Sequence, residues 1–122
     1  MNDIDEMVAD FIRKGEKLFE EAEKDLRIGA YNKAVSAYYF AVECYANALM
    51  LKKKQKARGF SSRKGVLASI ISREIARKFD YLYQLRVKAD HHADLLNEAD
   101  ALRAKDIALE IISSIKKYLQ MQ

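Results

Sequence analysis

Apolar residues recur every three or four positions from Ile4 to Ile28, and charged residues fill most of the positions between them. This spacing is the period of one face of an α-helix. Gly29 follows the stretch, and glycine commonly ends a helix because it adopts the left-handed backbone conformation without strain. The sequence therefore predicts a first, amphipathic helix over about residues 4–28.

The next stretch, Tyr31 to Leu51, is apolar almost all round. Sixteen of its 21 residues are apolar, and only Lys33 and Glu43 are charged. A helix of this kind is packed on several sides, so we expect it to be the central helix. Its length also admits a transmembrane interpretation. Glu43 argues against the membrane, because a charge near a bilayer centre costs several kcal/mol.

Two helices are predicted between residues 66 and 92. Apolar residues from Val66 to Ile75 indicate a short third helix. Phe79 and Asp80 mark a break, and Asp80 is a good cap for a fourth helix. The inner face of that fourth helix would carry Leu82, Leu85 and Ala89.

A last helix is predicted to begin at Asn97. Asn97 is a capping residue, and Asp100 three positions later supplies the acid of a capping box. Alanines and isoleucines then recur at helical spacing to the end of the chain, and no alternating strand pattern appears. The expected fold is all-α: an up-and-down bundle of four long helices plus one short helix, in a single domain over residues 1–122.

Composition agrees with a helical protein, since the 122 residues include no proline and only four glycines. The one cysteine, Cys44, cannot form an intramolecular disulfide, and its apolar surroundings predict a buried structural thiol. The first ten residues hold four acids and no base, unlike the basic start of a signal peptide. We therefore expect a cytoplasmic protein.

Seven basic residues without an acid separate the second predicted helix from the third. They are Lys52, Lys53, Lys54, Lys56, Arg58, Arg63 and Lys64. This basic segment (residues 52–64) is either a solvated, mobile loop or a surface that contacts nucleic-acid phosphates, whose binding would then depend strongly on salt. The net charge of +4 permits an acidic partner such as RNA. Ser61 or Ser62 could cap the next helix.

Both histidines lie in the stretch Tyr83–His92, together with Arg86 and Asp90. Histidine exchanges protons near neutral pH, and the arginine fork binds phosphate oxygens. RNA cleavage without a metal needs a base for the 2′-hydroxyl proton, an acid for the leaving oxygen and positive charge near the phosphorane. Arg86 and His91 are therefore the candidate catalytic residues, with Asp90 and His92 in supporting roles.

Helix geometry leaves other interpretations of this stretch open. Arg86 and His91 should point about 140° apart on an ideal helix, so they meet at one phosphate only if the helix distorts or a second chain contributes its own pair. Alternatively, Arg86 pairs with Asp90 one turn later, and His91 is exposed or caps the helix. His92 continues the apolar stripe, which favours a packed side chain.

No cofactor is expected, because the sequence has no glycine-rich phosphate loop and no paired-cysteine motif. A metal site formed by Asp90, His91, His92 and Asp94 is disfavoured. Adjacent histidines point apart on a helix, and two histidines do not complete a three-histidine site.

Several motifs, in this order and spacing, resemble the HEPN domain family, in its small single-domain prokaryotic branch. They are Ala22-Glu23-Lys24-Asp25-Leu26, Gly29-Ala30-Tyr31-Asn32-Lys33-Ala34, Ala37-Tyr38-Tyr39-Phe40-Ala41, Ala48-Leu49, Lys64-Gly65-Val66-Leu67 and Leu85-Arg86-Val87-Lys88-Ala89-Asp90. The resemblance covers nearly the whole chain.

The resemblance implies a helical bundle that forms a homodimer and is often paired with a minimal nucleotidyltransferase in toxin–antitoxin systems. Many active members are metal-independent endoribonucleases with an arginine, four to six residues, then a histidine. Arg86 and His91 fit with four residues between them, and His92 with five. The alternative is a non-catalytic module that binds nucleotide, RNA or a protein partner.

Three positions depart from the pattern of active or regulated members. Active members often carry a polar residue after the arginine, where this chain has Val87, and small members often have tyrosine at the position of His91. Toxins silenced by nucleotidylation carry a tyrosine two residues after the histidine. Ala93 stands there, so this regulation is not expected.

Overall fold

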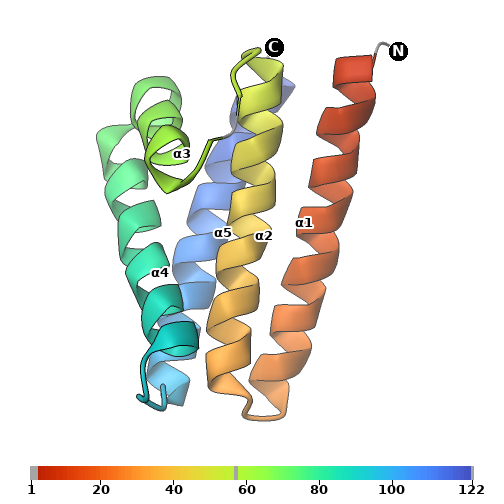
Figure 1. Ribbon diagram of the computed structural model, residues 1–122. Helices are drawn as coiled ribbons and strands as arrows, with labels where there is room; N and C mark the ends of the chain where they lie inside the picture. Colours follow the sequence, from red (N-terminus) through yellow and green to blue (C-terminus); the bar gives the residue numbers. More distant parts are fainter. Residues whose placement is uncertain (1–2, 57, 122) are drawn as a thin grey trace.

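The computed structural model describes residues 3–56 and 58–121. The ends of the predicted domain, residues 1–2 and 122, and Ala57 of the basic segment lie outside the described part. Four long α-helices run antiparallel (Figure 1): α1 (Asp3–Arg27), α2 (Tyr31–Lys52), α4 (Arg73–His91) and α5 (Glu98–Gln120). A short helix α3 (Phe60–Val66), continued by a π-helical turn η1 (Leu67–Ile71), joins α2 to α4. The predicted all-α bundle of four long helices and one short helix is confirmed.

α2 is the central helix, as predicted from its apolar surface. It packs against α1, α4 and α5 (Figure 1). The approach of α1 is close, because a Cβ atom placed on Gly15 would lie 2.8 Å from the ring of Tyr45 and 3.2 Å from the carbonyl oxygen of Ala41. No helix in the described part of the chain is long and apolar enough to cross a membrane.

Polar residues on α2 hold the connecting segments in place. Near its C-terminal end, Asn47 accepts a hydrogen bond from Arg63 Nε at 2.8 Å, and Glu43 Oε2 lies 3.7 Å from Arg63 Nη1. These contacts attach α3 to the bundle. Near its N-terminal end, Asn32 and Ser36 contact the C-terminal part of α4 and the connection after it.

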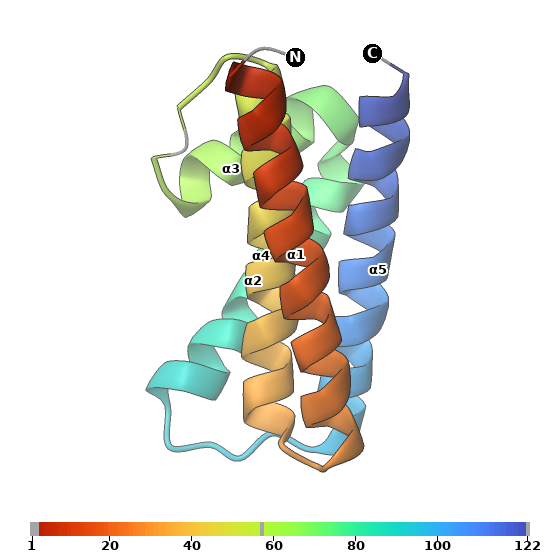
Figure 2. The same cartoon turned by 90° about the vertical axis from the view of Figure 1, so that its right-hand side faces the viewer.

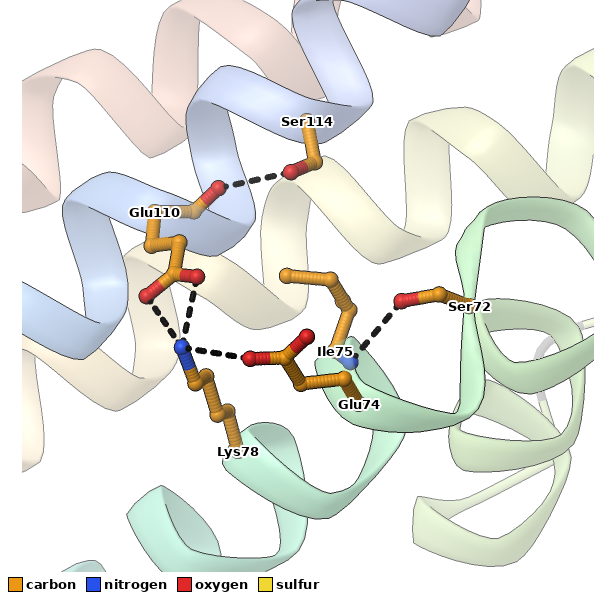
Figure 3. Close-up of polar contacts among 6 residues, drawn as sticks. All are labelled: Ser72, Glu74, Ile75, Lys78, Glu110 and Ser114. Atoms are coloured by element: carbon orange, nitrogen blue, oxygen red, sulfur yellow. Dashed lines mark hydrogen bonds and ion pairs between the residues drawn. The ribbon is translucent and has the colours of Figure 1, made fainter.

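The predicted boundary between the third and fourth helices is wrong. α4 begins at Arg73, and Ser72 is its N-cap: the Ser72 hydroxyl accepts a hydrogen bond from the Ile75 amide at 3.1 Å (Figure 3). Asp80 therefore lies inside α4 and caps nothing. Its carboxylate pairs with Lys64 Nζ at 2.6 Å, and this hydrogen bond lowers the pKa of Asp80.

Lys78 joins the N-terminal half of α4 to α5. Its ammonium lies 2.6 Å from both carboxylate oxygens of Glu110 and 3.3 Å from Glu74 (Figure 3). The hydrogen bonds to Glu110 raise the pKa of Lys78. This contact helps to fix how α4 is placed against α5.

Two of the predicted helix ends are confirmed. Gly29 has φ +79°, the left-handed conformation expected of a helix terminator. Asn97 and Asp100 form both bonds of the capping box, at 2.9 and 3.0 Å. The N-cap of α3 is Gly59, not a serine. Ser62 is the third helical residue, and its hydroxyl accepts from the Arg58 amide instead.

Cys44 is buried in α2, as predicted. Burial raises the pKa of its thiol, because the thiolate would lose its hydration. A thiol in this state is a poor nucleophile, which agrees with a structural role.

Candidate functional site

Arg86 lies on the side of α4 that faces α2, and its side chain is 22% exposed. The guanidinium carbon is 5.0 Å from the ring centre of Phe40 and 5.7 Å from that of Tyr39. Burial raises the pKa of Tyr39, so this phenol stays neutral beside the arginine. The two rings hold the cation by cation–π attraction.

Asp90 is the charged partner of Arg86, as their spacing of four residues predicts. Arg86 Nε lies 3.2 Å from Asp90 Oδ2, a distance that makes an ion pair. The Nε–H group is not directed at this oxygen well enough for a hydrogen bond, and the buried Nε has no hydrogen-bond partner among the described residues. The guanidinium is thus held mainly by packing and charge, with hydrogen-bond donors unused.

Ser36 holds Asp90 from the opposite helix. Its hydroxyl donates to Asp90 Oδ2 at 3.1 Å. Sequence reasoning missed the roles of Ser36 and Phe40. Their spacing offered a signal, because Asn32, Ser36 and Phe40 recur every four residues and therefore share one face of α2.

His91 is the last residue of α4, and its side chain is exposed. α4 stays α-helical from Arg73 to His91, so the distortion that would bring Arg86 and His91 together is not present. Ideal helix geometry keeps the two side-chain directions about 140° apart. One chain therefore does not converge its arginine and first histidine on one point.

His92 does not pack against the core, which corrects the prediction. The helix ends one residue earlier, and His92 has φ −106° and ψ 163°, an extended conformation. The apolar stripe is therefore not continued, and His92 is exposed. No group of three or more His, Cys, Asp or Glu side chains able to hold a metal occurs within residues 3–56 and 58–121.

Asp90 and Phe40, which both contact Arg86, line a groove of about 470 Å³ between α1, α2 and α4. Its charged lining residues are two carboxylates, Asp25 and Asp90, and one ammonium, Lys33. With more negative than positive charge, the groove of one chain is a poor site for a phosphate group.

The basic segment is mostly bound to the bundle. Lys52 pairs with Asp5, Lys53 donates to the hydroxyl of Tyr118, Arg63 contacts Glu43, and Lys64 pairs with Asp80. The side chains of the three others, Lys54, Lys56 and Arg58, are exposed and form no ion pair or hydrogen bond with the described chain. Within the described part of the basic segment, these three are the cations available to a partner without breaking an existing contact.

The two candidate regions lie at opposite ends of the bundle. The connection after His91 docks at the N-terminal end of α2, whereas the basic segment leaves its C-terminal end (Figure 1). α2 has 22 residues, so the regions are separated by about 30 Å. The sequence left the basic segment open as a solvated loop or a phosphate-contacting surface, and the fold places it away from Arg86 and the histidines.

The fold is that of a small all-α protein, an antiparallel bundle of long helices. The family model of the HEPN domain matches residues 8–118. The chain therefore belongs to the HEPN domain family, which confirms the resemblance found in the sequence.

A similar fold is present in the crystal structure of TT1696 from Thermus thermophilus. The TM-score is 0.79, and the match covers 91% of this chain and 97% of that chain. The two sequences are 20% identical, so the likeness concerns the fold. No curated protein matches the chain in sequence.

Proposed function

We propose that this HEPN protein is a metal-independent endoribonuclease of the toxin type that acts as a homodimer. Arg86 contacts the scissile phosphate, and His91 transfers the proton. Two copies of the chain bring their Arg86–His91 pairs to one shared cleft. The protein partner of such a toxin would be a nucleotidyltransferase, as the family resemblance implies.

The state of Arg86 carries this proposal. Its guanidinium is oriented by two aromatic rings and one carboxylate, yet its buried Nε has no hydrogen bond within the described chain. An unsatisfied buried donor is uncommon in a native protein and calls for an explanation. A phosphate that displaces Asp90 would accept the unused N–H donors in the forked geometry that arginine favours.

The geometry of one chain explains why the proposal needs two. Arg86 and His91 point about 140° apart on the continuous helix, and the groove beside them has more carboxylates than ammonium groups. A two-fold dimer can place the His91 of one copy beside the Arg86 of the other. It also supplies two histidines, one for the base and one for the acid of the reaction.

RNA cleavage in EDTA tests the proposal. The purified protein is expected to cut RNA without added metal, and His91→Ala is expected to lower the rate at least about a hundredfold, because proton transfer contributes about 10²–10⁴ to a rate. His92→Ala is the matched control, since it removes an adjacent, exposed histidine. Equal cleavage by the wild type and by His91→Ala would contradict the role of His91.

A non-catalytic binding module is the second candidate function. It is favoured by the Arg86–Asp90–Ser36 contacts, which already satisfy the charge of Arg86 within the chain. It is also favoured by the unpaired cations Lys54, Lys56 and Arg58 at the far end of the bundle. In this alternative, the basic segment binds RNA or another acidic partner without turnover.

Charge reversal separates the two candidates. The triple variant Lys54→Glu, Lys56→Glu, Arg58→Glu should weaken RNA binding and reduce the slope of log K against log salt by about 2, since each single-strand phosphate contact contributes about 0.7. Reversal of Arg13, Lys14 and Lys17, exposed cations on α1, changes the net charge equally and serves as the control. Binding unchanged by the first triple would exclude the basic segment as the RNA contact.

A further inference from the structure

Asn32, in the first turn of α2, binds the segment that follows the candidate site. Its Nδ2 donates to the carbonyl oxygen of Ala89 at 3.0 Å and to that of Asp94 at 3.1 Å. Its Oδ1 accepts from the Leu96 amide at 2.9 Å. Only one orientation of the amide satisfies both carbonyls and the N–H group, so the three bonds fix the side chain.

These bonds replace a missing helix cap. The last four carbonyl groups of a helix have no partner within it, and a following glycine in the left-handed conformation commonly helps to satisfy them. α4 is followed instead by His92 in an extended conformation. Asn32 satisfies the Ala89 carbonyl from a neighbouring helix, 57 residues away in sequence.

Asn32 also fixes the path of the connection between α4 and α5. Its two other bonds hold the backbone of Asp94 and Leu96. His91 and His92 therefore lie between Ala89 and Asp94, whose carbonyl groups both accept hydrogen bonds from the Asn32 side chain. Figure 2 shows this connection passing the N-terminal end of α2, at the end of the bundle away from the termini. The side chain of Leu96 is buried and provides a separate, apolar anchor.

We propose that Asn32 is a positioning residue that sets His91 and His92 relative to Arg86. The inference deepens the proposed function and rests on it, because His91 and Arg86 are the residues assigned to cleavage. Ser36, one turn further along α2, holds Asp90 and through it Arg86. One face of α2 therefore positions both parts of the site: Asn32 positions the histidines, and Ser36 positions the arginine.

The test compares Asn32→Ala with Asn47→Ala in the full-length protein. Asn47 is the matched control, because it is a half-buried asparagine on the same helix that binds Arg63 at the other end. Asn32→Ala should speed hydrogen exchange of the Leu96 amide by about tenfold or more and shift the ring NMR signals of both histidines. The Arg86 Nε–H signal should move less. Asn47→Ala should leave all of these signals unchanged.

Two further variants make the assignment specific. Asn32→Asp keeps the acceptor for the Leu96 amide but loses both N–H donors, so the histidine signals should shift while Leu96 keeps part of its protection. It also serves if Asn32→Ala does not fold. Ser36→Ala should have the reverse pattern, moving the Arg86 signal more than the histidine signals.

The kinetic constants kcat and KM distinguish a positioning role of Asn32 from a purely structural one. In Asn32→Ala, kcat for RNA cleavage should fall about tenfold while KM stays within about twofold, because the phosphate contact of Arg86 remains. Unchanged histidine signals, or an equal shift in Asn47→Ala, would overturn the inference. Shifted histidine signals in a protein whose wild type cuts no RNA would support the positioning by Asn32 and contradict the proposed function.

Discussion

Arg86→Ala is expected to abolish RNA cleavage, with a loss of at least about a hundredfold in rate, because preorganised donors at a developing charge contribute that much or more. Arg86→Lys should recover only part of the activity, since lysine keeps the charge but not the forked donors of arginine. The stability cost should be about 1–3 kcal/mol, because the largely buried Arg86 loses its pair with Asp90 and its contacts with two aromatic rings. Cleavage rates and denaturant unfolding measured together separate the two effects.

Arg77→Ala is the matched control for this experiment. Arg77 is an exposed arginine on the same helix, so its removal changes the net charge equally. It lies nine residues before Arg86 and outside the candidate site. A rate reduced equally by Arg77→Ala and Arg86→Ala would show a non-specific charge effect and contradict the phosphate contact.

Mixing two inactive variants tests whether the site forms across the dimer. A dimer of one Arg86→Ala chain and one His91→Ala chain contains an intact Arg86 and an intact His91 on different chains. If the pair forms between chains, one intact Arg86–His91 pair remains, and a small part of the activity returns although the second histidine is missing. If the pair forms within one chain, neither chain is complete and the mixture stays inactive. The 140° separation on α4 leads us to expect recovery.

Phe79→Ala is expected to lower the free energy of unfolding by about 3–5 kcal/mol, because it leaves a large cavity in a closely packed core. Phe79 is fully buried. Its ring stacks between Tyr39 of α2, at 5.7 Å, and Phe60 of α3, at 5.1 Å. For a domain whose whole stability is about 5–15 kcal/mol, this single change removes a large fraction. Denaturant unfolding followed by circular dichroism measures it.

Tyr81→Ala is the matched control, since Tyr81 is an aromatic residue on the same helix with 42% of its surface exposed. It should cost less than about 1 kcal/mol. If Phe79→Ala does not fold, Phe79→Leu keeps most of the volume and should cost about 1–2 kcal/mol. Equal losses for Phe79→Ala and Tyr81→Ala would show that the aromatic stack does not support the core.

The sequence was sufficient for most of the architecture. Periodic apolar positions gave the helices, and the apolar surface of Tyr31–Leu51 identified the central one. Gly29 and the Asn97–Asp100 capping box marked their ends correctly. These features depend on residues within one or two helical turns of each other, and such short-range interactions can be inferred from spacing.

The third and fourth helices show where this reasoning fails. The apolar residues from Val66 to Ile75 have a spacing that fits one uninterrupted helix, so the extended backbone at Ser72 left no signal in the pattern. Asp80 had the residue type of a cap. Its actual partner is Lys64 on another helix, and a contact of this kind depends on how the two helices are placed.

The candidate site is determined mainly by tertiary contacts. Spacing on one helix was enough to expect the Arg86–Asp90 pair and the divergence of Arg86 from His91. The partners on α2 are far away in the sequence. Ser36 lies 54 residues from Asp90, and Asn32 lies 57 residues from Ala89. Such contacts depend on the rotation and register of packed helices, which periodicity along one helix does not specify. For the same reason, only the folded chain separates the basic segment from the histidines and shows that, among the described residues of that segment, Lys54, Lys56 and Arg58 are the unpaired cations.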